Sequence, residues 1–103
     1  MTEKINMKIS SINGEVLLAA ADSSIVGKVI REGKLHLDIR SDFYGDMKVN
    51  DDTFVSSLGM CTIANLVGKY VVKKAIEEGY VDPDNIISIN NVPHAQFTRM
   101  PDS

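Results

Sequence analysis

Apolar and polar residues alternate in two stretches of the chain, residues 4–12 and 34–39. A period of two residues is typical of a strand that is buried on one face. Asn13 and Gly14 follow the first stretch, and this pair readily adopts the positive φ angles of a type I′ hairpin turn. Residues 15–20 are apolar on both faces, so we predict that the chain returns here as a central strand.

A longer period indicates helices in the middle of the chain. Phe54, Leu58 and Cys61 are spaced so that they share one face of a helix that starts at residues 50–52. Residues 62–78 continue with apolar positions between polar and charged ones, and we predict a second helix over this whole segment.

The C-terminal part of the chain predicts one more pair of strands, residues 86–89 and 92–97. Asn90 and Asn91 lie between them and can form a tight turn. The second strand should lie at a sheet edge, because Pro93 lacks the N–H group that a central strand needs. With about four or five strands and about two or three helices, the pattern predicts an α+β fold. We expect a small, mostly antiparallel sheet of four to five strands with two to three helices packed on one face.

Length and composition narrow the class of protein. A chain of 103 residues predicts one domain, 1–103, with an ordered core of about residues 4–97. No apolar run approaches the roughly 18 residues of a membrane helix, and no secretory signal pattern is found at the N-terminus. The one cysteine excludes an intramolecular disulfide. We therefore expect a cytoplasmic protein, and the small size is compatible with a homo-oligomer.

The charge balance bears on the kind of partner. The chain has 11 Lys and Arg against 14 Asp and Glu, a net charge of −3. Proteins that grip a nucleic-acid backbone usually present a basic field, so we expect no autonomous binding to bare DNA or RNA. Docking by shape onto an already folded ribonucleoprotein stays open.

Few residues could bind a metal or a cofactor. The His and Cys residues are His36, His94 and Cys61, whereas a structural zinc site almost always needs four such ligands. Residues 27–34 lack both the spacing and the hydroxyl group of a Walker phosphate loop. We therefore expect neither a metal nor a cofactor. Cys61 falls on the apolar face of its helix, where a core residue is expected rather than a nucleophile.

The strongest candidate for a functional residue is His94, which follows Pro93. A proline can fix a turn or a cis peptide bond and so direct the next side chain. In an extended chain Gln96 shares a face with His94. His94 is then a recognition residue, a general acid/base with an ordinary pKa of about 6.5, or a structural residue that hydrogen-bonds to the backbone. These alternatives stay open.

Three other residues complete the predicted binding surface. Phe43 and Tyr44 are neighbours in a predicted loop, and one ring should enter the core while the other covers it. Asn65 is a polar residue among apolar ones and is either a buried hydrogen-bonding residue or a helix cap. A helix restarting at Lys69 would offer backbone N–H groups to an anion. We predict that the binding surface contains Tyr44, which could stack, Asn65, Lys69, which would meet a phosphate or carboxylate, His94 and Gln96.

Short segments along the chain carry a resemblance to a known family. They are Val26-Gly27-Lys28, Arg31-Glu32-Gly33-Lys34-Leu35, Phe43-Tyr44-Gly45, Ile63-Ala64-Asn65-Leu66-Val67-Gly68-Lys69, Ala75-Ile76-Glu77-Glu78-Gly79 and Val92-Pro93-His94-Ala95-Gln96. In this order and spacing they resemble the archaeal family catalogued as domain of unknown function 424. The likeness covers most of the chain, with Asn90-Asn91 where the family commonly has a Gly-bearing turn. The resemblance implies a short archaeal cytosolic protein of α/β character and supplies no established catalytic residues.

Three hypotheses for the function follow. The first is a non-enzymatic accessory protein that docks on RNA, a ribonucleoprotein or a translation-related protein. The second is a small enzyme acting on a nucleotide-like anionic metabolite, with His94 as general acid/base and residues 65–69 as the anion site. The third is an oligomerising module whose C-terminal strand pairs with the edge of another chain. The scarcity of catalytic residue types favours the first.

Overall fold

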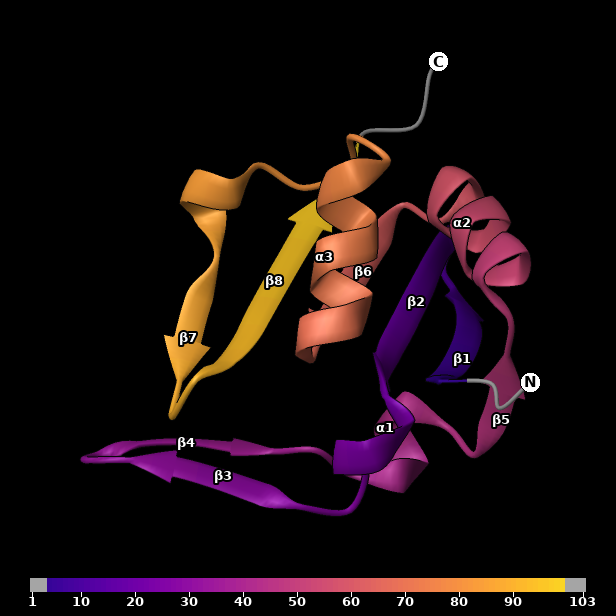
Figure 1. The fold of residues 1–103 in the computed structure, drawn as a ribbon. Coiled ribbons are helices and arrows are strands. Elements are labelled where there is room, and N and C mark those ends of the chain that lie inside the picture. The colour runs from indigo at the N-terminus through magenta and orange to yellow at the C-terminus, as the bar shows by residue number, and fades with distance from the viewer. Residues whose placement is uncertain (1–3, 100–103) are drawn as a thin grey trace.

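The computed structural model describes residues 4–99, and its largest element is a mixed sheet of six strands (Figure 1). In space the strands follow the order β5-β1-β2-β6-β8-β7. Their bounds are Ile5–Ile12 (β1), Glu15–Asp22 (β2), Met47–Val49 (β5), Ile63–Val67 (β6), Ile87–Ile89 (β7) and Val92–Thr98 (β8). The α+β class is confirmed, but the sheet has more strands than the predicted four to five, and it is not purely antiparallel.

Two hairpin turns form where the sequence predicts them. Asn13 and Gly14 join β1 to β2 with φ angles of 52° and 82°. Asn90 and Asn91 join β7 to β8 with φ angles of 48° and 66°. Positive φ angles at both central residues are the mark of the type I′ turn, and asparagine tolerates them better than other residues with a side chain.

Two of the helices, α2 (Asp51–Met60) and α3 (Lys69–Glu77), cover one face of the sheet (Figure 1). Asn50 caps α2 by accepting a hydrogen bond from the Thr53 N–H at 2.8 Å. The main core lies under these helices and includes Ile5, Met7, Leu18, Phe54, Leu58, Leu66, Val71 and Val72. None of the helices within residues 4–99 is long and apolar enough to cross a membrane.

The third helix, α1 (Ser41–Tyr44), occupies a segment that we predicted as a loop. Its Tyr44 packs with Ala19 and Ala21 of β2. Leu18 and Ala20, which alternate with these alanines along β2, belong to the core under α2 and α3. Because successive residues of a strand point to opposite faces, α1 lies on the other side of the sheet. The prediction of helices packed on one face only is therefore wrong.

The segment 62–78 is not one helix, as we predicted, but strand β6 followed by α3. β6 runs parallel to β2 on one side and antiparallel to β8 on the other. A short apolar run that is buried in the middle of a sheet has no period that separates it from a buried helix, so the pattern alone was misleading. This parallel pair also makes the sheet mixed.

Strand β8 lies inside the sheet and not at its edge, which is another correction to the prediction. The Pro93 carbonyl accepts a hydrogen bond from the Gly68 N–H at 2.9 Å, and His94 is the next residue and the last one paired with β6. The N and C=O of one strand residue point to the same side. The missing N–H of Pro93 therefore falls just past the end of β6, where the ladder does not need it. The peptide bond before Pro93 is trans.

A separate hairpin of β3 (Val29–Glu32) and β4 (Leu35–Asp38) projects beside the sheet (Figure 1). We call residues 28–40 the hairpin arm. Its apolar residues Ile30, Leu37 and the fully buried Ile39 pack in the cluster around Tyr44. The Glu32 carboxylate accepts a hydrogen bond from the Asn90 N–H, which ties the arm to the β7–β8 turn.

Candidate functional site

The face of the sheet opposite α2 and α3 is only partly covered, and we call it the open face. Its strand residues alternate with the core residues of the other face and include Leu17, Ala19, Ala21, Ile63, Asn65, Val67, Val92, His94 and Gln96. Tyr44 and the hairpin arm cover one part of it. The open face therefore presents Asn65, His94 and Gln96, three residues of the predicted binding surface.

Helix α1 packs Tyr44 directly against the open face of the sheet. Its side chain is only 3% exposed and packs in one cluster with Ala19, Ala21 and Val67. Phe43 covers it, and the two rings meet edge to face with their centroids 4.9 Å apart. The prediction of one core ring and one covering ring is confirmed. The predicted stacking role of Tyr44 is wrong, because a buried ring cannot reach a ligand.

Asn65 joins Tyr44 to His94. The Tyr44 hydroxyl donates to Asn65 Oδ1 at 2.8 Å, and His94 Nε2 lies 3.1 Å from the same oxygen. An amide oxygen can only accept, so the proton of the neutral imidazole is on Nε2 and Nδ1 is left as an acceptor. The sequence suggested a buried hydrogen-bonding role for Asn65 or a cap, and the structure shows the hydrogen bonds at a side chain that is half-buried.

Burial keeps both partners of Asn65 uncharged at neutral pH. It raises the pKa of the Tyr44 hydroxyl to about 12 and lowers the pKa of the His94 imidazole. Desolvation disfavours the charged form of each group, which explains the opposite directions. The cluster of Tyr44, Asn65 and His94, which we call the polar cluster, is therefore suited to neutral hydrogen bonding rather than to ionic contacts.

The other two predicted residues differ in their relation to this cluster. Gln96 is exposed and lies directly opposite Asn65 in the β6–β8 pairing, two residues after His94. Lys69 is exposed at the start of α3, and within residues 4–99 no hydrogen bond or ion pair joins it to Tyr44, Asn65 or His94. The structure thus brings three predicted residues into contact and adds Gln96 beside them.

The anion site predicted at the start of α3 is already filled by the chain itself. The Asp22 carboxylate accepts hydrogen bonds from the N–H groups of Tyr70 and Val71 at 3.0 and 2.9 Å. These are the backbone donors that a helix N-terminus leaves without a partner inside the helix. The N–H groups that we expected to be free at Lys69 are thus capped by a residue from β2, so the predicted anion site is wrong.

Cys61 lies on the face of the sheet that α2 and α3 cover, in the main core. Its thiol is buried and donates to the Leu58 carbonyl at 3.4 Å, and burial raises its pKa. A thiol with a raised pKa is a poor nucleophile, so the predicted core role fits. No group of three or more His, Cys, Asp and Glu that could hold a metal ion is found in the described part of the chain.

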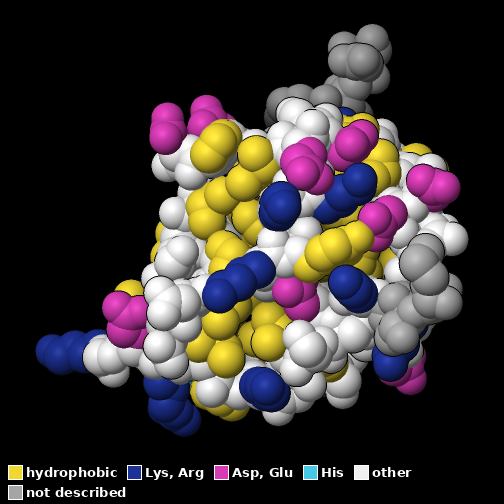
Figure 2. All heavy atoms as spheres, in the orientation of Figure 1, with side chains coloured by type: hydrophobic (Ala, Val, Ile, Leu, Met, Phe, Trp, Pro, Cys, Tyr) yellow, Lys and Arg dark blue, Asp and Glu magenta, His cyan; other side chains and the backbone are white. Residues whose placement is uncertain are grey.

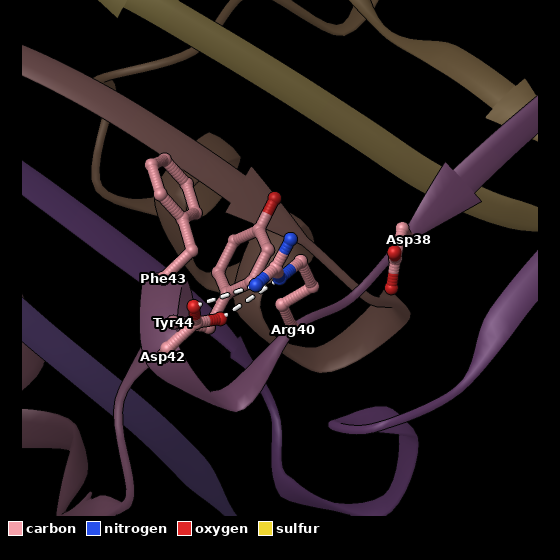
Figure 3. Close-up of a pocket in the computed structure, with 5 residues that line it drawn as sticks. All are labelled: Asp38, Arg40, Asp42, Phe43 and Tyr44. Carbon is pink, nitrogen blue, oxygen red and sulfur yellow. Dashed lines mark hydrogen bonds and ion pairs between the residues drawn. The ribbon is translucent and has the colours of Figure 1, made fainter.

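Arg40 and Asp42 lie next to the polar cluster, although they are not among the residues predicted for the binding surface. Arg40 Nε and Nη2 donate to the two carboxylate oxygens of Asp42 at 3.0 and 2.8 Å (Figure 3). This bond raises the pKa of Arg40 and lowers the pKa of Asp42. With Asp38, Phe43 and Tyr44 they line an open hollow of about 440 Å³. The order Arg-Ser-Asp-Phe-Tyr was the available signal, since a charged pair directly precedes two rings.

The lowered pKa of His94 predicts that acid destabilises the protein through this residue. Below a pH of about 6.5 the unfolded chain binds a proton at His94 that the folded chain resists. The free energy of unfolding therefore decreases as the pH is lowered. One proton contributes at most about 1.4 kcal/mol per pH unit. Urea unfolding at a pH of about 7.5 and of about 5 measures this loss.

His94→Gln should reduce this loss of stability, because glutamine keeps an N–H donor but does not titrate. His36→Gln is the matched control, since it removes the other histidine from an exposed position of β4. Equal acid sensitivity of the wild type and His94→Gln would show that His94 does not resist protonation.

Comparison with known proteins supports the fold and the family. A crystal structure of an uncharacterised conserved protein from Methanopyrus kandleri superposes with a TM-score of 0.81 at 19% sequence identity. The match covers 96% of this chain and 94% of that chain. The comparison with curated proteins gives no match. The model of the family described as "Protein of unknown function (DUF424)" matches residues 10–100. The chain therefore belongs to the DUF424 family, as the resemblance of its segments suggested.

Proposed function

We propose that the protein is a non-enzymatic cytoplasmic accessory factor that docks on a ribonucleoprotein or a translation-related assembly through the polar cluster of the open face. The observation that carries the proposal is the shared oxygen of Asn65. This oxygen accepts hydrogen bonds from both Tyr44 and His94. The other polar atoms of the pair, Asn65 Nδ2 and His94 Nδ1, have no hydrogen-bond partner within residues 4–99.

These two atoms face solvent. Among the described residues that are not exposed, no buried side-chain nitrogen or oxygen lacks a partner. Asn65 and His94 are both half-buried, so their remaining polar atoms reach the surface. An amide donor and an imidazole acceptor held side by side match a partner with one acceptor and one donor. Such pairs occur on peptide groups and on the edges of nucleobases.

The position of the cluster also suits docking. Tyr44 is anchored in a packed cluster, and Asn65 lies in a strand with a partner on both sides. Leu17, Ile63 and the exposed Gln96 surround the cluster on the same face. Polar groups that are fixed in advance on rigid elements lose little entropy on binding, which favours recognition.

The enzyme alternative keeps one supporting observation. His94 stays a neutral imidazole because burial lowers its pKa, and a neutral imidazole can act as a base. Its proposed anion site is occupied by Asp22, and Cys61 lies on the other face of the sheet. The docking function therefore has the better support. A thermal-shift screen with nucleotides tests the alternative, which predicts stabilisation by a nucleotide that is lost in His94→Gln.

An affinity capture from lysate of the source cells tests the docking proposal. The tagged wild type should enrich a defined set of ribosomal or translation proteins, and His94→Gln should weaken the capture of this set because its amide oxygen does not occupy the position of the Nδ1 acceptor. Circular dichroism spectra must show that the variant is folded. Lys73→Ala is the matched control, since Lys73 is exposed on α3 at the other face.

Lys69→Glu tests whether Lys69 belongs to the surface as the sequence predicted. Because Lys69 makes no polar contact with the cluster within residues 4–99, its reversal should weaken capture less than His94→Gln. Equal capture by the wild type and His94→Gln would contradict the docking site.

A further inference from the structure

The hairpin arm concentrates positive charge in an acidic protein. Residues 28–40 contain four of the 11 basic residues, Lys28, Arg31, Lys34 and Arg40, and two of the 14 acidic ones, Glu32 and Asp38. With the histidine neutral, the arm has a formal charge of +2, which leaves −5 on the rest of the chain. All six charged residues are exposed, and Figure 2 shows basic side chains at the tip of the arm.

The acidic groups of the arm are engaged, whereas most of its cations are free. Glu32 accepts from the Asn90 N–H, and Asp38 lies close enough to Arg40 to help raise its pKa. Within residues 4–99 the Arg40–Asp42 pair is the one ion pair formed. Lys28, Arg31 and Lys34 therefore project their full charge into solvent.

The arm leads directly to the polar cluster. Ile30 and Leu37 pack in the same cluster as Tyr44, and the hollow at the base of the arm is lined by both Arg40 and Tyr44 (Figure 3). The Phe43 ring borders this hollow and is 39% exposed, so part of its surface is open to a ligand. Free cations, an exposed aromatic ring and neutral hydrogen-bonding groups thus follow one another on connected elements.

We infer that the arm and the hollow bind a single strand of RNA. The phosphates follow the arm past Lys34 at its turn and Lys28 at its base, with Arg31 on the face of β3 opposite to Ile30. One unpaired base stacks on Phe43 and reaches the polar cluster. Proteins that bind single strands combine these same features, a basic track for the backbone and aromatic rings for the bases. An acidic protein surface would use the cations but not the ring. The inference rests on the proposed function and names the chemistry of its partner.

The net charge of −3 predicts no binding to RNA, but it is an average over the whole surface. Screening by salt limits the reach of surface charges to about 8 Å under physiological conditions. Since Asp42 offsets Arg40, a strand held on the projecting arm meets three unpaired cations, Lys28, Arg31 and Lys34, against Glu32 and Asp38, which is a local charge of +1. The acidic remainder directs the strand to the arm and not elsewhere.

Fluorescence anisotropy with a short labelled single-stranded RNA of mixed sequence tests the inference on the full chain. Arg31→Glu/Lys34→Glu should weaken binding at least about tenfold and reduce the dependence of log K on log salt by about 0.7 for each cation removed. Lys48→Glu/Lys73→Glu is the matched control, since it makes the same charge change at exposed positions outside the arm. Equal losses in the two double variants would overturn the assignment to the arm.

Phe43 variants test the stacking contact separately. Phe43→Leu should weaken binding about tenfold, whereas Phe43→Tyr should bind like the wild type, because it keeps the ring. Equal or tighter binding of duplex RNA, or of a poly-aspartate peptide, would overturn the single-strand assignment. Absence of RNA binding by the wild type would also overturn it. If the wild type does not bind RNA but capture from lysate still depends on His94, the docking function is supported and the RNA-binding inference alone is wrong.

Discussion

Gly68→Ala is expected to destabilise the protein by about 3 kcal/mol or more. Gly68 joins β6 to α3 with φ 113° and ψ 152°, a conformation that is open essentially to glycine alone. An alanine Cβ at this position would also overlap the carboxyl group of Asp22. That group cannot simply move away, because it caps the N–H groups of Tyr70 and Val71. Urea unfolding measures the loss.

Gly79→Ala is the matched control for this prediction. Gly79 also has a positive φ of 82°, but an added Cβ meets nothing within 4 Å. Its cost should be limited to the backbone strain of about 1 kcal/mol. Equal costs at Gly68 and Gly79 would contradict the packing of Asp22 against the start of α3. In the presence of Asp22→Ala, Gly68→Ala should cost less than it does alone, because the overlap with the carboxyl group is gone and only the 2.8 Å contact with the Cβ of residue 22 remains.

Asn65→Ala is expected to cost about 2–3 kcal/mol, because it removes the acceptor of two donors at once. The Tyr44 hydroxyl belongs to a side chain that is only 3% exposed, so no water easily replaces the lost oxygen. The His94 imidazole also loses the bond that fixes its tautomer and orientation. The stability should fall in urea unfolding, and partner capture should weaken together with it.

A double-mutant cycle separates the network from a simple loss of packing. Tyr44→Phe removes the hydroxyl. In this background Asn65→Ala leaves no buried hydroxyl without an acceptor, so it should cost about 1 kcal/mol less than in the wild type. Gln96→Ala is the control, since Gln96 lies opposite Asn65 in the β6–β8 pairing but is exposed, and its cost should stay within about 0.5 kcal/mol. Strict additivity of Tyr44→Phe and Asn65→Ala would show that the hydrogen bond contributes nothing.

Part of the candidate site followed from local patterns. The period of a strand places His94 and Gln96 on one face, and two adjacent rings divide into the buried Tyr44 and the covering Phe43. The partners of Asn65 could not be found in this way. Tyr44 and His94 are 21 and 29 positions away along the chain. Only the pairing of β6 with β8 and the placement of α1 bring them to one oxygen.

The charge of the site shows the same limit. Composition gives a net charge of −3 and scattered basic residues. Four of these basic residues lie within residues 28–40, and the structure projects this segment as the hairpin arm and engages Glu32 with a backbone N–H from the distant β7–β8 turn. A free cation and a neutralised one have the same letter in the sequence, and only the contacts of the folded chain tell them apart.

Local chemistry decided the turns and the start of α2, since each depends on a few neighbouring residues. Asparagine and glycine accept positive φ angles in the two turns, and Asn50 caps α2 by accepting a hydrogen bond from the N–H of Thr53, three residues ahead. Long-range pairing decided the rest. Ile63–Val67 became a strand because β2 and β8 supply backbone partners on both of its sides. The start of α3 lost its anion site because Asp22 reaches it from a strand 48 positions away. The hydrogen bonds that fix these features join groups which no local pattern can pair.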